Sequence, residues 1–252
     1  MANNKKYFIG NWKMFGVHES INILNKINNY IKIDKNQRKY NVIIAPPYTL
    51  LHSFSKSYKN KKISISSQNC HFKDFFSSDT GSISSYMIKK LGCKYSIVGH
   101  SDNRIEGDTD QMLKNKVNFS LKNNLKVIFC IGENKIQKEK KQTFSILSKQ
   151  LNKVLEKKFN SKNIIIAYEP IWSIGTGKIP NSVDLLKTTK FIKKTLNRIF
   201  KTKESSPVLY GGSVEGGNIA QFKEIDQIDG FLIGGASKSS KKFIDIIKNY
   251  YR

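Results

Sequence analysis

Three side chains able to do acid–base or electrostatic chemistry each lie within four residues of the end of a short apolar run. They are Lys13, His100 and Glu169. A carboxylate among apolar residues can act as a general base, an imidazole can donate a hydrogen bond to a developing oxyanion, and an ammonium can offset its charge. Each residue also has an ordinary interpretation, as a solvated lysine, a buried core histidine and a salt-bridged carboxylate. Their positions after apolar runs favour chemistry at one shared site.

Two glycine-rich turns follow the last two apolar runs of the chain. One is Gly211-Gly212-Ser213 and the other is Gly234-Gly235. Glycine allows backbone N–H groups to approach a phosphate closely, and the start of a following helix adds partial positive charge. A single Gly-Gly pair usually marks only a turn, whereas two pairs after consecutive runs favour a cradle for a phosphate.

The segment from Pro170 to Lys178 directly follows Glu169 and combines a rigid start with a glycine-containing tip. Apolar side chains inside it could pack onto the body of the protein when the segment closes. The segment is therefore a candidate lid over the site, although an ordinary loop between a strand and a helix would also fit.

The elements that must position these residues are short runs of β-branched and aromatic residues without clean alternation. Such runs are typical of strands that are buried on both faces. Eight of them lie at residues 7–9, 42–45, 63–65, 95–98, 126–129, 164–167, 208–210 and 230–233. Apolar residues at helical spacing occupy 21–31, 112–121, 144–155, 185–200 and 243–247.

Strands that alternate with helices fit either an open doubly wound sheet or a closed (β/α)8 barrel. The strand count and the length of 252 residues favour the barrel, as one α/β domain over residues 1–252. The carboxyl ends of barrel strands meet at one mouth, so the residues after the runs should converge there.

The composition of the chain limits which classes of partner and which cellular location we expect. The formal net charge is +25, but only four of the 44 cationic residues are Arg and the lysines are spread along the chain. Nucleic-acid surfaces usually cluster cations and favour Arg, so we expect no nucleic-acid partner, only attraction for small anions. No run of about 20 apolar residues is present, so we expect no membrane span. The apolar stretch at residues 7–9 is too short for a signal peptide, and the three cysteines are scattered, so we expect a cytoplasmic protein.

Nine strings spread over essentially the whole chain resemble the triosephosphate isomerase family. They lie at residues 10–14, 45–47, 67–69, 97–101, 130–133, 167–172, 174–178, 210–214 and 229–236. Any one short match could arise by chance, but their joint presence in this order and at barrel spacing is highly specific.

The resemblance implies a glycolytic and gluconeogenic isomerase that interconverts dihydroxyacetone phosphate and D-glyceraldehyde 3-phosphate through an enediolate, with no metal or organic cofactor. Glu169 would move the proton and His100 would polarise the carbonyl, a pairing for which this family is a standard example. Asn11 and Lys13 would contact the substrate and complete the catalytic set. The resemblance also assigns phosphate binding to Gly175, Ser213, Gly234 and Gly235, and supporting roles to Ser101 and Asp102.

Two departures from the family pattern fall close to this site. Asp102 stands where the family usually has a glutamate, so its carboxylate is one methylene shorter and a loss of reach could lower the rate. The far end of the lid reads Lys178-Ile179-Pro180 instead of the usual Lys-Thr-Ala. Because proline restricts the residue before it, the motion of the lid is left open.

Further departures fall on the loop through which the family forms homodimers. Thr80 and Gly81 are kept, whereas Asp79 replaces an aromatic residue and Ser82 replaces a glutamate. The arginine that this glutamate pairs with is Asn103 here. Losing one partner of a buried ion pair typically costs about 3–5 kcal/mol, and losing both avoids that penalty. We therefore expect a homodimer with a neutral contact between Ser82 and Asn103, and with a looser interface.

Two other functions compete with the isomerase. A different phosphate-binding barrel enzyme would explain the glycine turns but not the strings around His100 and Glu169. A catalytically weakened basic barrel could act as a scaffold that binds anions or nucleic acid, and it would require cations clustered on one face.

Overall fold

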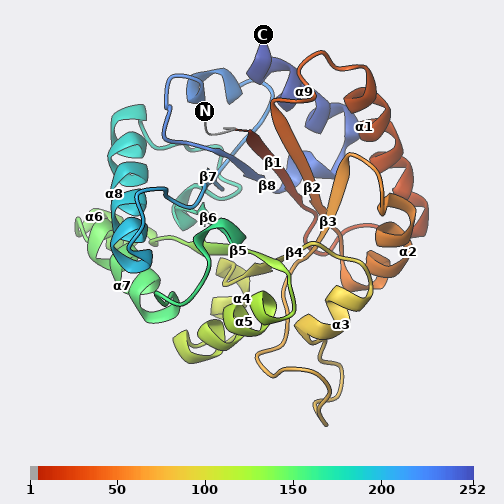
Figure 1. Ribbon diagram of the computed structural model, residues 1–252. Coiled ribbons are helices and arrows are strands. Elements are labelled where there is room, and N and C mark those ends of the chain that lie inside the picture. Colours follow the sequence, from red (N-terminus) through yellow and green to blue (C-terminus); the bar gives the residue numbers. More distant parts are fainter. Residues whose placement is uncertain (1–4) are drawn as a thin grey trace.

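The computed structural model describes residues 5–252, which form a closed barrel of eight parallel strands (Figure 1). The expectation about a signal peptide rests partly on residues 1–4, which lie outside the described residues. The strands are β1 (Lys6–Asn11), β2 (Tyr40–Ala45), β3 (Ile63–Ser67), β4 (Tyr95–Val98), β5 (Lys126–Ile131), β6 (Ile164–Tyr168), β7 (Val208–Tyr210) and β8 (Gly230–Ile233). Each strand pairs with the next, and β8 pairs with β1, so the predicted barrel is confirmed and the open sheet is wrong.

Helices surround the barrel and cover the outer face of its strands (Figure 1). They are α1 (Ile21–Ile33), α2 (Tyr48–Tyr58), α3 (Ser85–Lys90), α4 (Ser101–Ile105), α5 (Asp110–Lys122), α6 (Lys135–Glu139), α7 (Thr143–Val154), α8 (Ser182–Phe200) and α9 (Ser240–Tyr251). Short 3-10 helices occupy His18–Ser20, Ser161–Asn163, Ile171–Ser173, Ile219–Phe222 and Gly235–Lys238. All five predicted helical stripes lie on helices of the structure, apart from Leu155 at the end of one stripe.

The hydrophobic core has two layers because each strand is buried on both faces. One layer fills the barrel interior and contains Ile9, Ile43, Ala45, Tyr95, Ile97, Ile128, Cys130, Ile165, Ala167, Leu209 and Leu232. The larger layer lies between the strands and the helices. This double burial explains why the strand sequences lack alternation.

The barrel closes where β8 meets β1, and this junction needs a residue without a side chain. A Cβ at Gly230 would collide with the backbone of Tyr7 on β1, and Gly230 has a φ of 154°. The closure therefore depends on glycine at this position.

Two residues of the predicted helical stripes differ from expectation. Phe144 on α7 is half exposed and stacks on Phe191 of α8, with ring centroids 4.6 Å apart, instead of packing on the sheet. Leu155 is buried but follows the end of α7, in extended backbone. A hydrophobic stripe indicates which face is apolar, whereas the helix end is set by local backbone geometry.

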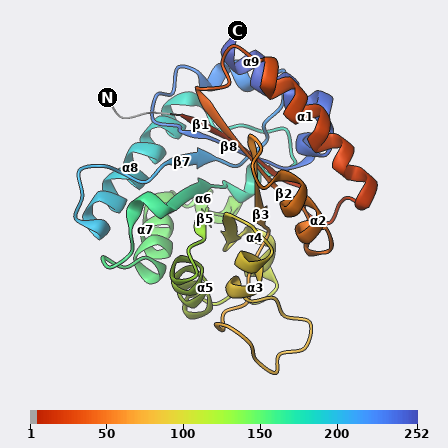
Figure 2. The same ribbon diagram turned by 45° about the vertical axis from the view of Figure 1, so that its right-hand side comes forward.

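The loop between β3 and α3, residues 68–84, projects from the body of the molecule (Figures 1 and 2). Its aromatic side chains lie outside the core: Phe75 stacks on Tyr86 with centroids 4.7 Å apart, and Phe76 is 76% exposed. Asp79 accepts hydrogen bonds from Lys73 at 2.9 Å and Ser77 at 2.5 Å. The loop is thus held in shape by its own polar contacts while it presents apolar surface outward.

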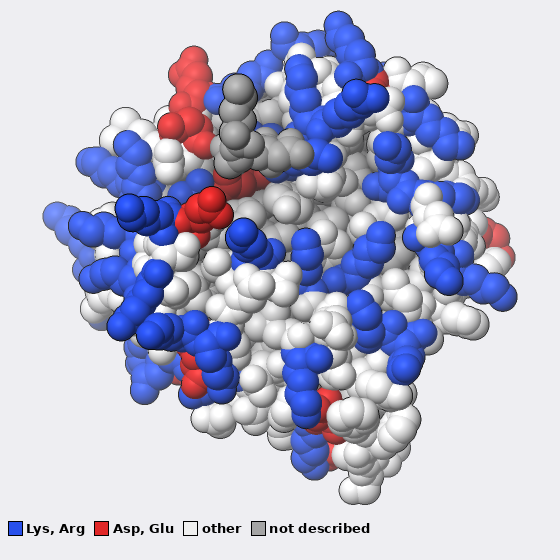
Figure 3. All heavy atoms as spheres, in the orientation of Figure 1, with Lys and Arg blue, Asp and Glu red and all other residues white. Residues whose placement is uncertain are grey.

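Lys and Arg side chains are spread around the face of the molecule shown in Figure 3, with a paler hollow near its centre. They do not gather into the single stripe that a nucleic-acid scaffold would use. Within residues 5–252, no helix combines the length and the apolar character that crossing a membrane requires.

Candidate active site

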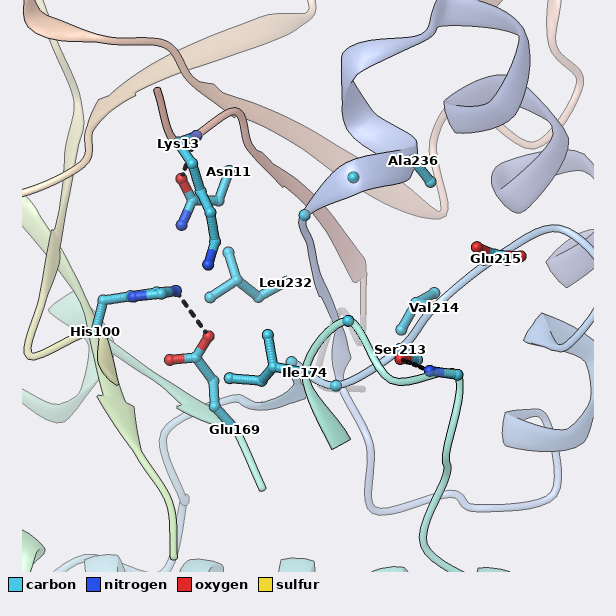
Figure 4. A pocket seen from close by; sticks show the side chains of 16 residues that line it. Asn11, Lys13, His100, Glu169, Ile174, Ser213, Val214, Glu215, Leu232 and Ala236 are labelled. Carbon is cyan, nitrogen blue, oxygen red and sulfur yellow. Dashed lines mark hydrogen bonds and ion pairs between the residues drawn. The ribbon is translucent and has the colours of Figure 1, made fainter. Parts of the chain in front are cut away.

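The carboxyl ends of the strands enclose a cavity of about 320 Å³ that contains the predicted chemical residues (Figure 4). Asn11 lies at the end of β1, Lys13 and His100 in the loops after β1 and β4, and Glu169 directly after β6. Residues separated by more than 150 positions in the sequence therefore line one pocket. The structure brings together the four side chains that the sequence analysis singled out as catalytic.

The side chains of His100 and Glu169 point toward each other across the cavity (Figure 4). Nε2 of His100 lies 3.3 Å from Oε1 of Glu169, and both side chains are about 95% buried. The other carboxylate oxygen, Oε2 of Glu169, is buried without a hydrogen-bond partner among the described residues. An unpaired buried carboxylate oxygen is unusual for a structural residue and leaves an acceptor available for a proton.

The start of α4 fixes the orientation of the imidazole. His100 is the N-cap of this helix, and its Nδ1 accepts a hydrogen bond from the backbone N–H of Asp102 at 3.1 Å. With Nδ1 acting as an acceptor, the ring proton is on Nε2, which faces Glu169. Burial lowers the pKa of His100, but the charge of Glu169 and its hydrogen bond more than offset this and raise the pKa.

Two glycines pack closely against Glu169, one against its side chain and one against its backbone, and so fix its position. A Cβ at Gly211 would lie 2.7 Å from Cγ of Glu169, and a Cβ at Gly132 would collide with the Glu169 carbonyl oxygen. Ile174 and Leu232 also line the cavity and lie close to the carboxylate in Figure 4. The base candidate therefore sits in a tight, partly apolar pocket with little freedom.

Lys13 has an unusual backbone conformation, with a φ of 54°. Its N–H donates to Oδ1 of Asn11 at 3.0 Å, and its carbonyl accepts from Nε2 of Gln68 at 2.8 Å. Gln68 also donates to the carbonyl of Ala45, at 2.8 Å. A left-handed conformation costs a non-glycine residue about 1 kcal/mol or more, so these contacts hold Lys13 in a strained position facing the cavity.

Asp102 still reaches Lys13 despite its shorter side chain. Its Oδ2 lies 3.1 Å from Nζ of Lys13, and both side chains are partly exposed. An ion pair this exposed contributes little to stability, so its effect is on the direction in which the ammonium points. Ser101 is buried in the first turn of α4. Arg104 donates to the carbonyls of Gly99 at 2.8 Å and Cys130 at 3.0 Å, which ties the ends of β4 and β5 together.

The predicted phosphate residues line the opposite part of the cavity from His100. They are Gly175, Ser213, Gly234 and Gly235. A Cβ built at any of these three glycines would find nothing within 4 Å, so their backbone borders open space. That space suits an anionic group held by backbone N–H groups.

The predicted lid lies closed over this part of the site. The N–H of Gly177 donates to Oγ of Ser213 at 3.1 Å (Figure 4). At the near end, Nε1 of Trp172 donates to Oε1 of Glu133 at 3.1 Å, and the Tyr168 hydroxyl donates to the same oxygen at 3.1 Å. Burial raises the pKa of Glu133 against the lowering effect of these hydrogen bonds.

Some predicted residues lie elsewhere, and some lining residues were not predicted. Thr80, Gly81, Ser82 and Asn103 do not line the cavity, as expected for interface candidates. The sequence analysis did not identify Gln68, Glu133, Val214, Glu215 and Leu232 as site residues. Four of them lie inside the matched strings and Glu215 directly follows one, and this placement is the only signal that could have indicated them. Among residues 5–252, no group of three His, Cys, Asp or Glu side chains is placed to hold a metal ion.

The closed (β/α)8 barrel with an imidazole, a carboxylate and glycine-rich turns at its mouth defines the class: a barrel enzyme with a pocket for a small phosphorylated substrate. The comparisons with known proteins narrow this class. Residues 6–250 match the family model described as Triosephosphate isomerase, and the chain belongs to the triosephosphate isomerase family. It catalyses the interconversion of dihydroxyacetone phosphate and D-glyceraldehyde 3-phosphate.

The similarity to relatives covers nearly the full length of both chains. The chain is 37% identical to the triosephosphate isomerase of Mycoplasma capricolum, with 98% of each chain covered. It is 36% identical to that of Debaryomyces hansenii, over 97% of this chain and 98% of the relative. The crystal structure of the Bartonella henselae enzyme superposes with a TM-score of 0.89 at 31% identity, over 98% of this chain and 100% of that one.

The close approach at Gly211 yields a first prediction. In Gly211→Ala, the added methyl group displaces the Glu169 side chain, and we expect kcat/KM to fall about 100-fold while the barrel stays folded. Coupled-assay kinetics and circular dichroism measure the two properties. The matched control is Gly217→Ala, where a Cβ meets nothing within 4 Å. Wild-type kinetics in Gly211→Ala would contradict the placement of the carboxylate.

Proposed function

We propose that Glu169 is the base that moves a proton between adjacent carbons of the triose phosphate, and that His100 polarises the carbonyl. The observation that carries this proposal is the facing pair itself, with Nε2 of His100 3.3 Å from Oε1 of Glu169 and the second oxygen unpaired. A substrate carbon placed beside the unpaired Oε2 of Glu169 would lose its proton to the carboxylate, and the bound substrate would take the place of Oε1 as the partner of the His100 imidazole. The carbonyl oxygen of the substrate would receive a hydrogen bond from the Nε2–H of His100.

We assign charge stabilisation at the same carbonyl to Lys13, with Asn11 holding Lys13 in place and contacting the substrate. The ammonium faces the cavity from a backbone that Asn11 and Gln68 fix. A cation already positioned where negative charge develops lowers the barrier without reorganisation. In this role Lys13 balances the enediolate and the phosphate together.

The phosphate group would be held by backbone N–H groups of Gly175, Gly234 and Gly235 and by Ser213. Closure of the lid, Pro170 to Lys178, excludes water from the reacting carbons. It also keeps the enediolate in the plane in which its phosphate is a poor leaving group. Binding of the remote phosphate thus provides the energy that holds the lid closed during the proton transfer.

The base assignment is tested by Glu169→Gln. The amide keeps the size of the side chain but cannot accept a proton at neutral pH, so we expect kcat to fall about 10³-fold with a small change in KM. Coupled assays in both directions measure these constants.

The matched control is Glu204→Gln, which makes the same chemical change at an exposed site outside the cavity and should leave both constants unchanged. Full activity in Glu169→Gln would refute the assignment. A wild-type protein without activity would instead favour the scaffold function.

We also propose that the protein is a homodimer that associates through the loops after β1, β2 and β3. These strands are neighbours in the barrel, so their loops lie side by side at the mouth. Large apolar side chains are exposed on the loops after β1 and β3 and at the start of α2, which follows the β2 loop: Met14, Val17, Tyr48, Phe75 and Phe76. A patch of exposed apolar side chains of this kind marks an association surface.

The predicted contact between Ser82 and Asn103 belongs to this proposed interface. Among residues 5–252 of one chain, Nδ2 of Asn103 makes only a long contact with Oε2 of Glu106, at 3.4 Å. Both interface candidates are half-buried in the monomer and neutral. A dimer structure with these two side chains far apart would refute the contact but leave the other parts of the interface intact.

The interface proposal predicts that Phe76→Ser weakens the dimer. Removing a largely exposed aromatic side chain leaves the monomer fold intact but removes about 2 kcal/mol of association energy, so the dimer dissociation constant should rise about 10-fold or more. Sedimentation velocity over a concentration series measures it. Ile33→Ser, at the end of α1 and equally exposed, is the control. An unchanged dimer in Phe76→Ser would contradict this surface.

The remaining expectations are consistent with these proposals. We propose that residues 1–252 form one barrel domain, with no nucleic-acid partner, in the cytoplasm. All three cysteines are buried free thiols, which suits a reducing compartment.

A further inference from the structure

The hydroxyl of Ser173 is fully buried at the near end of the lid, and the roles proposed above do not use it. Ser173 closes the short 3-10 helix that follows Glu169 and Pro170. A buried hydroxyl must be hydrogen-bonded, so its partners show what it does. Its two partners come from different parts of the site: the far end of the lid and the end of β7.

The Ser173 hydroxyl joins these two partners in one chain of hydrogen bonds. Its Oγ donates to the carbonyl of Lys178 at 2.5 Å and lies 2.9 Å from the hydroxyl of Tyr210. Because the Ser173 hydroxyl donates its one proton to the Lys178 carbonyl, the Tyr210 hydroxyl must be the donor to Ser173. Burial raises the pKa of Tyr210 to about 12, so this donor keeps its proton at physiological pH.

A second chain of hydrogen bonds also ties the lid to the turn after β7, and it passes through Ser213, the candidate phosphate-binding residue. The N–H of Gly177 donates to Oγ of Ser213, and the Ser213 hydroxyl donates to the carbonyl of Ser173 at 2.8 Å. The closed lid is therefore tied at Ser173 by its hydroxyl and by its carbonyl. Only the second chain includes a residue that would touch the substrate.

A proline lies just beyond the far end of the lid. Pro180 is buried and directly precedes Asn181, the N-cap of α8. Proline has no N–H, so the backbone at this position donates no hydrogen bond. The Lys178 carbonyl, two residues earlier, is instead tied to Tyr210 through the Ser173 hydroxyl.

The neighbouring turn is shaped to leave room for this contact. A Cβ at Gly212 would collide with both the Tyr210 hydroxyl and Oγ of Ser173. Gly212 lies next to Ser213 in the turn after β7, so the turn that offers a phosphate contact also clears space for the hydroxyl pair.

We propose that Ser173, Lys178 and Tyr210 form a lid latch in which the Ser173 hydroxyl is a positioning residue for the isomerase reaction. The latch holds both ends of the closed lid to β7 while the enediolate exists. This inference rests on the lid role proposed above and extends it to residues that do not touch the substrate.

The latch makes two measurable quantities depend on Ser173. Because the contact belongs to the closed state, its loss lowers kcat and kcat/KM together and leaves KM nearly unchanged. A lid that opens early also exposes the enediolate. The C1 oxygen then becomes a carbonyl and the C1=C2 electron pair forms a C2=C3 double bond. The C3–O bond breaks, inorganic phosphate leaves with the bonding pair, and the remaining enol takes up a proton from water. The phosphate released per isomerisation therefore reports on closure.

The test compares Ser173→Ala, Tyr210→Phe and the double variant. Ser173→Ala removes both hydrogen bonds of the Ser173 hydroxyl and leaves the buried Tyr210 hydroxyl unpaired. We therefore expect kcat to fall about 10-fold and the phosphate released per turnover to rise about 10-fold. Tyr210→Phe leaves the bond from Ser173 to Lys178 and should show a smaller effect. The double variant removes the unpaired hydroxyl, so its loss should be smaller than the product of the single losses.

Ser206→Ala is the matched control, because Ser206 is also a buried serine that donates to a backbone carbonyl, but it lies just before β7 at the opposite end of the barrel. It should lower the melting temperature without changing kcat or phosphate release.

Wild-type kcat and phosphate release in a folded Ser173→Ala enzyme would overturn the latch, as would strictly multiplicative losses in the double variant. If Ser173→Ala does not fold, wild-type phosphate release in Tyr210→Phe overturns it. Neither result affects the base assignment, which Glu169→Gln tests separately.

Discussion

The contact between the Glu169 carboxylate and the His100 imidazole is the constraint on which the rest of the site depends. The two side chains come from loops after β4 and β6, and their polar atoms are 3.3 Å apart, with both side chains about 95% buried. Holding a carboxylate and an imidazole this close in a buried site requires rigid supports on both sides. The helix start at His100 provides one support, and the close approaches of Gly132 and Gly211 to Glu169 provide the other.

The barrel makes this arrangement possible because the residues that stabilise the fold differ from the residues that carry the chemistry. The two core layers are built from strand residues that face the interior and the helices, whereas the chemical groups come from the loops at the carboxyl ends. A strained group and an unpaired group, the Lys13 backbone and Oε2 of Glu169, lie at that end. They persist because the core fixes the loops around them. The segment proposed as a lid contacts the turn after β7 through the hydrogen bond from Gly177 to Ser213.

The sequence predicted the eight strands and the chemical residues because both leave local signals. Doubly buried strands appear as short apolar runs, and the residues after them must meet at the mouth of a parallel barrel. Short helices such as α4 and α6 have only five residues, too few for a periodic pattern. The Ser173–Tyr210 contact joins residues 37 positions apart, and Gln68 reaches Lys13 across 55 positions. Contacts of this kind depend on packing in three dimensions and leave no trace in local sequence.

The central claim is that the proton travels between the substrate carbons on an exchangeable carboxyl group. The most direct measurement is the isomerisation of dihydroxyacetone phosphate in D2O, with the initial product analysed by NMR. A carboxylate that carries the proton exchanges with solvent, so the account predicts deuterium on C2 of the newly formed glyceraldehyde 3-phosphate. Product that forms at the full rate with only protium at C2 would show a direct hydrogen shift between the carbons and would contradict the account.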